Sequence, residues 1–137
     1  MRIALVDRHP IFRTGIRVLL QNHLSDLTIR ETSCLNSLGN ETQSSQFDII
    51  IIGLSEEQPD IDPGELVNHM LENPGARFIL YDSLSQHELA FSLFRIGVRG
   101  YLTKKTCPSD LLKCIESVAR GETYFCDGSR QHSVSDL

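Results

Sequence analysis

The chain has 137 residues, a length that fits one domain of the α/β class. Hydrophobic residues make up 40% and charged residues 23%, so the chain can bury a core and does not have the composition of a disordered protein. The formal net charge of −5 argues against nucleic-acid binding by this domain alone, because attraction to phosphates needs a basic surface.

The first half of the chain contains three expected strands and two expected helices. Residues 3–6 and 49–52 are short apolar runs, typical of strands that are buried on both faces of a parallel sheet. Residues 27–30 alternate between apolar and polar, as an exposed edge strand does. Pro10 begins a helix with one apolar face, whereas residues 35–45 are polar and only weakly helical in pattern.

The second half of the chain continues the alternation of helices and strands. Asp62 and the three residues after it resemble a capping box with proline at the first helical position, and residues 85–88 form a second such box. Residues 78–80 and 98–103 are the expected fourth and fifth strands. Residues 107–110, Cys-Pro-Ser-Asp, open the last helix.

A strand followed by a helix, repeated five times, predicts an α/β fold with a doubly wound parallel sheet. The edge pattern of the second strand favours the flavodoxin-like (βα)5 order 2-1-3-4-5, in which a site forms where the first and third strands end. Those ends carry Asp7 and Gly53. We expect residues 1–125 to form this domain, and residues 126–137 to be a linker or truncated tail.

The cysteines and histidines show no pattern of a metal or redox site. Cys34, Cys107, Cys114 and Cys126 form no C-x-x-C pair, and the histidines are scattered. The first residues lack the pattern of a secretory signal peptide, and no apolar run is long enough to cross a bilayer. We therefore expect a cytoplasmic protein with free thiols, without a metal, a cofactor or a membrane partner.

Three motifs stand in a fixed order along the chain. Residues 7–13 read Asp-Arg-His-Pro-Ile-Phe-Arg, residues 47–52 are Phe-Asp followed by four isoleucines, and residues 97–104 read Gly-Val-Arg-Gly-Tyr-Leu-Thr-Lys. Together they resemble the receiver domains of bacterial response regulators, most closely the branch that is joined to a LuxR-type helix-turn-helix domain. The resemblance spans roughly residues 2–125 and implies a phosphorylation site at the carboxyl ends of the strands.

In that family, two acidic residues after the first strand and one aspartate after the third strand hold Mg²⁺. The third-strand aspartate accepts a phosphoryl group from a histidine kinase. A threonine or serine after the fourth strand and a lysine after the fifth strand contact that group. Carboxylates suit the site because Mg²⁺ is a hard cation that prefers oxygen ligands, and the lysine adds a second positive charge.

The resemblance places Asp7 at the first acidic position and Arg8 at the second. Gly53 stands at the position of the phosphorylated aspartate, so the nucleophile is missing. Arg8 would put a cation beside the place of the metal. Residues 55–62 also depart from the family, with Pro59 displaced from its usual place.

The remaining positions come from the fourth and fifth strands. The family's spacing from Lys104, which matches the lysine, puts Asp82 at the threonine or serine position, with Ser83 next to it as an alternative. Tyr101 matches the aromatic residue that often changes rotamer on activation.

Two interpretations of these substitutions stay open. Asp7 and Asp82 can balance the two cations at positions 8 and 104 in a four-residue salt-bridge cluster that mimics a fixed state of the phosphorylation site. Alternatively, Arg8 and Asp82 point into solvent, since surface ion pairs often contribute little.

We expect a phosphorylation-independent receiver domain of a transcription regulator, not an enzyme, that acts in signalling and dimerisation. Its expected partners are a second copy, DNA through a C-terminal domain absent from this chain, and a regulatory protein. Self-association is expected through residues 85–121, or through the first and last helices. The alternatives are a stand-alone adaptor and a sensor whose small ligand fills the space left by Gly53.

Overall fold

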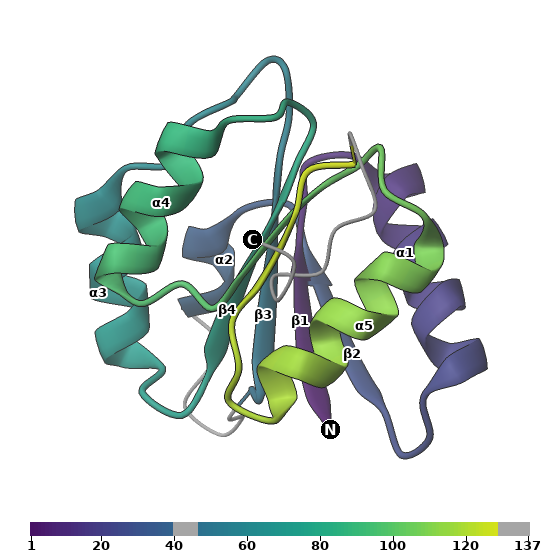
Figure 1. The fold of residues 1–137 in the computed structure, drawn as a ribbon. Coiled ribbons are helices and arrows are strands. Elements are labelled where there is room, and N and C mark those ends of the chain that lie inside the picture. Colours follow the sequence, from purple (N-terminus) through teal and green to yellow (C-terminus); the bar gives the residue numbers. More distant parts are fainter. Residues whose placement is uncertain (40–46, 129–137) are drawn as a thin grey trace.

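The computed structural model describes residues 1–39 and 47–128. Over these residues the chain forms a six-stranded parallel sheet with helices on both faces (Figure 1). Helices α1 and α5 lie on one face, and α2, α3 and α4 lie on the other. The strands are β1 Arg2–Val6, β2 Thr28–Thr32, β3 Ile49–Leu54, β4 Arg77–Asp82, β5 Gly100–Thr103 and β6 Tyr124–Cys126. The helices are α1 Pro10–His23, α2 Leu35–Gly39, α3 Pro63–Glu72, α4 His87–Ile96 and α5 Pro108–Ala119.

The strand order is β2-β1-β3-β4-β5-β6. It confirms the predicted flavodoxin-like order 2-1-3-4-5 and adds a sixth strand, which the sequence did not predict. Tyr124 lies opposite Gly100, so this strand lies beside β5 and its last residue, Cys126, is the first residue of the expected tail. Three residues are too few for a periodic pattern, and the free edge of β5 that supplies their hydrogen-bond partners exists only in the folded sheet.

Two apolar layers, one on each face of the sheet, explain why the strands are continuous apolar runs. Successive side chains of a strand point to opposite faces, so each layer takes every second residue. The layer under α1 and α5 is built mainly from Ile3, Leu5, Ile49, Ile51, Ile16, Leu20, Leu111 and Ile115. The layer under α3 and α4 is built mainly from Ala4, Val6, Ile50, Ile52, Leu66, Phe78, Leu80 and Leu93.

The helices begin at identifiable residues. The side chain of Asp62 caps α3 by accepting a hydrogen bond from the backbone N–H of Gly64 at 3.2 Å. The backbone N–H of Cys107 donates to Asp110 at the start of α5, as its sequence predicts. The capping box expected at residues 85–88 is wrong: α4 begins at His87, with no capping side chain.

Several boundaries differ from the sequence-based ones by a few residues. β2 is residues 28–32 instead of 27–30, and β5 begins at Gly100 instead of residue 98. The weak helix expected over residues 35–45 is observed as Leu35–Gly39, and the rest of that range lies outside the described residues.

Candidate functional site at the carboxyl ends of the strands

Four strands end at the same edge of the sheet and carry the expected site residues. Asp7 follows β1, Gly53 lies near the end of β3, Asp82 ends β4 and Lys104 follows β5. The strand register aligns these ends, with Asp82 opposite Thr103 of β5. The structure therefore brings the expected residues to one edge of the sheet, and their role as a site stays a prediction.

Asp7 and Lys104 form a nearly buried ion pair. Lys104 Nζ lies 2.9 Å from Asp7 Oδ2, and the side chains of Asp7 and Lys104 are only 6% and 15% exposed. Lys104 Nζ also lies 4.2 Å from the centroid of the Phe12 ring, a cation–π contact. The positive charge of Lys104 is thus engaged by a carboxylate and an aromatic face together.

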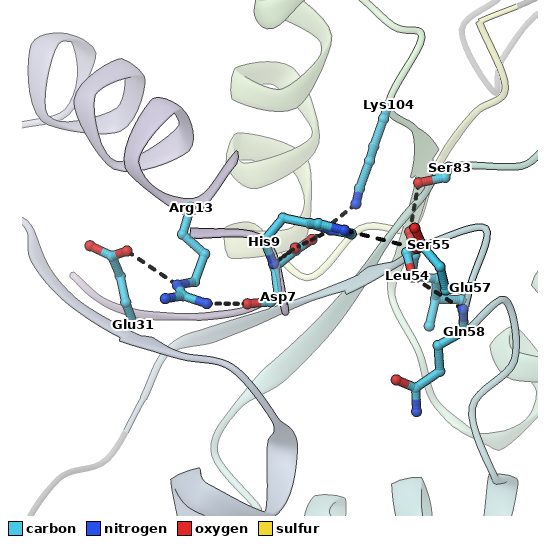
Figure 2. A network of polar contacts seen from close by, with 10 residues as sticks. All are labelled: Asp7, His9, Arg13, Glu31, Leu54, Ser55, Glu57, Gln58, Ser83 and Lys104. Atoms are coloured by element: carbon cyan, nitrogen blue, oxygen red, sulfur yellow. Dashed lines mark hydrogen bonds and ion pairs between the residues drawn. The ribbon is translucent and has the colours of Figure 1, made fainter. Parts of the chain in front are cut away.

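Further donors from α1 hold Asp7 in place (Figure 2). The backbone N–H of His9 donates to Asp7 Oδ1 at 2.8 Å, and the His9 ring lies between Asp7 and Glu57. Arg13 donates to the backbone carbonyl of Asp7 and pairs with Glu31 of β2. His9, at the start of α1, thus holds the Asp7 carboxylate through both its backbone and its ring.

Gly53 is the position where Asp7 comes closest to the sheet. A Cβ atom built on Gly53 would lie 1.9 Å from Asp7 Oδ2 and 2.8 Å from Asp7 Cγ. The carboxylate of Asp7 therefore occupies the space where a side chain at position 53 would begin. Gly53 also lines a neighbouring cavity, so a small ligand in the space left by Gly53 stays a prediction.

Asp82 is fully buried and belongs to a separate network. Its Oδ2 accepts hydrogen bonds from the Tyr101 hydroxyl at 2.7 Å and from Gln86 Nε2 at 3.0 Å, and its Oδ1 accepts one from the backbone N–H of Leu84 at 3.1 Å. Gln86 Nε2 also donates to the carbonyl of Pro59, which links the loop after β3 to the loop after β4. Three hydrogen-bond donors thus satisfy this carboxylate, whose burial without partners would cost free energy.

The Tyr101 hydroxyl is held from both sides. It donates to Asp82 and accepts a hydrogen bond from the backbone N–H of Gln86 at 2.9 Å. Burial, together with the hydrogen bond to Asp82, raises the pKa of Tyr101 well above its ordinary value. The hydroxyl therefore stays protonated and remains a donor throughout the physiological pH range.

The geometry corrects the expected four-residue salt-bridge cluster. It consists instead of an ion pair, Asp7 with Lys104, and a separate hydrogen-bonded pair, Asp82 with Tyr101. Arg8 is exposed and forms no ion pair with another described residue. The alternative, in which Arg8 and Asp82 both face solvent, fits Arg8 and is wrong for Asp82.

Hydrogen bonds fix the loops after β3 and β4. Ser83, the alternative to Asp82, donates its hydroxyl to the carbonyl of Leu54 at 2.9 Å. Ser55 and Gln58 exchange backbone hydrogen bonds and close the loop after β3. Sequence reasoning missed Gln86, which carried no signal beyond its place in an expected helix cap.

Mg²⁺, the metal that the family's site would hold, does not fit the residues present. Asp7 is already paired with Lys104, the second acidic position is Arg8 and the third is Gly53. Among residues 1–39 and 47–128, no group of three or more His, Cys, Asp or Glu side chains is placed to hold a metal ion. The donor set is thus short of the oxygen ligands that Mg²⁺ needs.

No family model matches the chain. The nitrate/nitrite response regulator protein NarL of Escherichia coli is 31% identical over 127 residues, which cover 91% of this chain and 57% of NarL. A LuxR family DNA-binding response regulator from Silicibacter pomeroyi has the same fold, with a TM-score of 0.78, 21% identity, and coverage of 95% of this chain and 99% of that chain.

The chain is a homologue of the LuxR-family response regulators. It has the fold of their receiver domain. A structure of two RcsB dimers bound to two parallel DNAs is also similar, with a TM-score of 0.77, 20% identity, and coverage of 93% of this chain and 65% of that chain. The receiver spans about three fifths of the length of the curated relatives that it matches. No helix within the described part of the receiver is long and apolar enough to cross a membrane.

Proposed function

We propose that this chain is an atypical receiver domain that signals without phosphorylation, as part of a cytoplasmic transcription regulator. The observation that carries the proposal is the Asp7–Lys104 ion pair seated over Gly53. Position 53 offers no nucleophile, and the space for one is filled by the carboxylate of Asp7.

The charge of the site supports the same conclusion. In the family the lysine after the fifth strand contacts the phosphoryl group. Here Lys104 is neutralised by Asp7 at 2.9 Å and lies over the ring of Phe12. A phosphoryl group would have to displace a nearly buried ion pair, and breaking such a pair leaves a costly uncompensated charge.

The hydrogen-bonded network of Asp82, Tyr101 and Gln86 supports a site that keeps Tyr101 in a single, inward rotamer. Tyr101 is fully buried, with its hydroxyl fixed by Asp82 and by the backbone of Gln86. In the family this aromatic residue often changes rotamer on activation. A carboxylate at position 82 is a stronger acceptor than the hydroxyl of a threonine, so the chain itself supplies the contact that favours the inward rotamer.

Self-association and DNA binding extend the proposal to the whole regulator. The relatives are longer than this chain, and RcsB is seen as dimers on DNA. We infer that a DNA-binding domain lies outside this chain and that the receiver pairs two copies of it. Of the two expected faces we favour the one on α1 and α5, because β6 already occupies the edge of β5 while Ile11 and Val18 of α1 are 89% and 48% exposed.

One observation favours a second candidate function, a sensor of a small molecule. A cavity of about 170 Å³ lies beside the ion pair, between β1, β3, α2 and α3. Arg8, Cys34 and Ser55 are among the residues that line it. A ligand that binds there would contact the exposed guanidinium of Arg8 without displacing Asp7.

Incubation with a small phosphodonor and Mg²⁺, followed by intact-mass measurement, tests the proposal. We expect no change in mass for the wild-type chain, which has no carboxylate at position 53. We expect none for Gly53→Asp either, because Arg8 stays charged beside the metal position and Asp82 keeps a carboxylate where the family has a hydroxyl. The triple variant Gly53→Asp, Arg8→Asp, Asp82→Thr is the minimal set expected to restore phosphorylation.

The outcomes separate three explanations. A hydroxylamine-labile adduct on the wild-type chain refutes the proposal, and Asp7→Asn or Asp82→Asn then identifies the acceptor. Phosphorylation of Gly53→Asp alone means that the site has lost only its nucleophile. A triple variant that stays inert points to the altered loop over residues 55–62.

A further inference from the structure

Strand β6 packs on the rest of the molecule largely through aromatic rings. The Phe125 ring stacks on the Tyr101 ring of β5, with centroids 5.6 Å apart and an interplanar angle of 14°. The Phe125 ring also stacks on the Phe91 ring of α4, with centroids 5.8 Å apart. It makes an edge-to-face contact with the His87 ring, with centroids 5.3 Å apart. β6 is thus held to α4 as well as to the edge of the sheet.

Polar contacts fix the end of the strand. His87 Nε2 lies 2.8 Å from Asp127 Oδ2, and the Thr103 hydroxyl donates to the backbone carbonyl of Asp127 at 2.8 Å. Asp127 therefore joins the first residue of α4 to the last residue of β5. The chain leaves β6 beside the same loops that form the candidate site.

Tyr101 belongs both to the hydrogen-bonded network of Asp82 and to the aromatic contacts of β6. Its hydroxyl is bound by Asp82 in the candidate site, and its ring carries Phe125 of β6. An outward rotation of Tyr101 would remove the hydrogen bond to Asp82 and the stacking surface under Phe125 in one movement. Since burial of aromatic area and ring stacking both stabilise the contact, the two losses are energetically linked.

We propose that β6 is a latch that packs on Tyr101, so that the state of the Asp82 site sets how firmly β6 is docked on the sheet. The inference rests on the proposed function, because it makes the fixed inward position of Tyr101 the signal that is passed on. It assigns Asp82 and Gln86 the role of positioning residues for Tyr101, and it assigns Phe125, His87 and Asp127 to the latch.

Hydrogen exchange of the full chain, followed by mass spectrometry, tests the latch. In Tyr101→Phe the ring remains but the bond to Asp82 is lost, and a hydrogen bond to a charged group contributes enough to change exchange roughly tenfold or more. We expect the peptide over residues 124–126 to exchange about tenfold faster relative to the peptide over β1. Tyr81→Phe is the matched control, because Tyr81 is another buried tyrosine whose ring contacts Phe12, whereas it is the Tyr101 ring that stacks on Phe125.

The reverse direction uses Phe125→Leu in protein labelled with 3-fluorotyrosine. We expect the ¹⁹F resonance of Tyr101 to shift or split while that of Tyr81 stays unchanged. Equal acceleration of exchange in Tyr101→Phe and Tyr81→Phe would overturn the latch, and so would an unaltered Tyr101 resonance in Phe125→Leu. Both readouts are independent of phosphodonor chemistry, so a failed latch leaves the mass measurements on the proposed function intact.

Discussion

At the scale of single residues, the space beside Gly53 is filled by a neighbouring carboxylate. A glycine at position 53 allows the carboxylate of Asp7 to approach the backbone of β3, where any side chain would collide with it. The same carboxylate reaches Lys104 at 2.9 Å. The glycine at position 53 and the ion pair between Asp7 and Lys104 are therefore two parts of one local structure.

Gly53→Ala should lower the stability of the chain. The added methyl group would lie within collision distance of Asp7 and force the ion pair to move, and overpacking of this kind costs about 1–3 kcal/mol. Urea unfolding measures the change. Gly15→Ala is the control: no atom lies within 4 Å of its added Cβ, and it should gain up to about 1 kcal/mol from helix propensity. Equal stability of wild type and Gly53→Ala would show that Asp7 moves aside without cost.

At the scale of elements, β6 and α1 decide which surfaces remain for partners. β6 extends the sheet beyond β5, so the face formed by α4, β5 and α5 includes a strand that the sequence did not predict. On α1, Ile11 and Val18 stand one heptad apart on the same side of the helix and are exposed. Exposed apolar residues in such a row are typical of an interface.

The double variant Ile11→Glu, Val18→Glu should weaken self-association at least about tenfold, because charges at the centre of an interface must be desolvated without a partner. Sedimentation velocity over a range of concentrations measures this. Leu71→Glu serves as the control, because Leu71 is an apolar residue on α3, away from α1, that is 73% exposed. If Phe91→Glu abolishes self-association and the α1 variant does not, the interface lies on the α4 and β5 side.

At the scale of the whole molecule, the sheet and its helices place all three tyrosines in protected surroundings. Burial is the main cause that raises the pKa of Tyr81, of Tyr101 and of Tyr124 above their ordinary values. For Tyr101 the hydrogen bond to Asp82 adds to the effect. The folded state therefore favours the protonated form of each tyrosine hydroxyl, and the free energy of unfolding depends on pH.

The native protein should therefore form tyrosinate at higher pH than the unfolded chain. Below a pH of about 10, the ordinary pKa of tyrosine, both states are protonated and the stabilisation is complete. Above that pH the unfolded chain ionises first, so the free energy of unfolding falls as pH rises. Absorbance at 295 nm with and without guanidinium measures the shift. Coincident titration curves would contradict the protected positions of these side chains.

The sequence by itself determined the fold class and the order of the first five strands. Runs such as Ile49 to Ile52 are apolar at every position because a parallel sheet covered by helices buries both faces of its strands. The resemblance also predicts the roles of Arg8 and Gly53 from motifs of consecutive residues. These features are local, and each is written in consecutive residues.

Only the tertiary structure decided what the substituted residues do. Asp7 and Lys104 are 97 residues apart, and the charges alone also allowed a cluster with Arg8 and Asp82. The folded chain instead buries Asp82 under Tyr101 and leaves Arg8 exposed. β6 was hidden for the same reason: its partners on β5 and α4 are distant in the chain, and hydrogen bonding and burial depend on which surfaces meet, which no local pattern encodes.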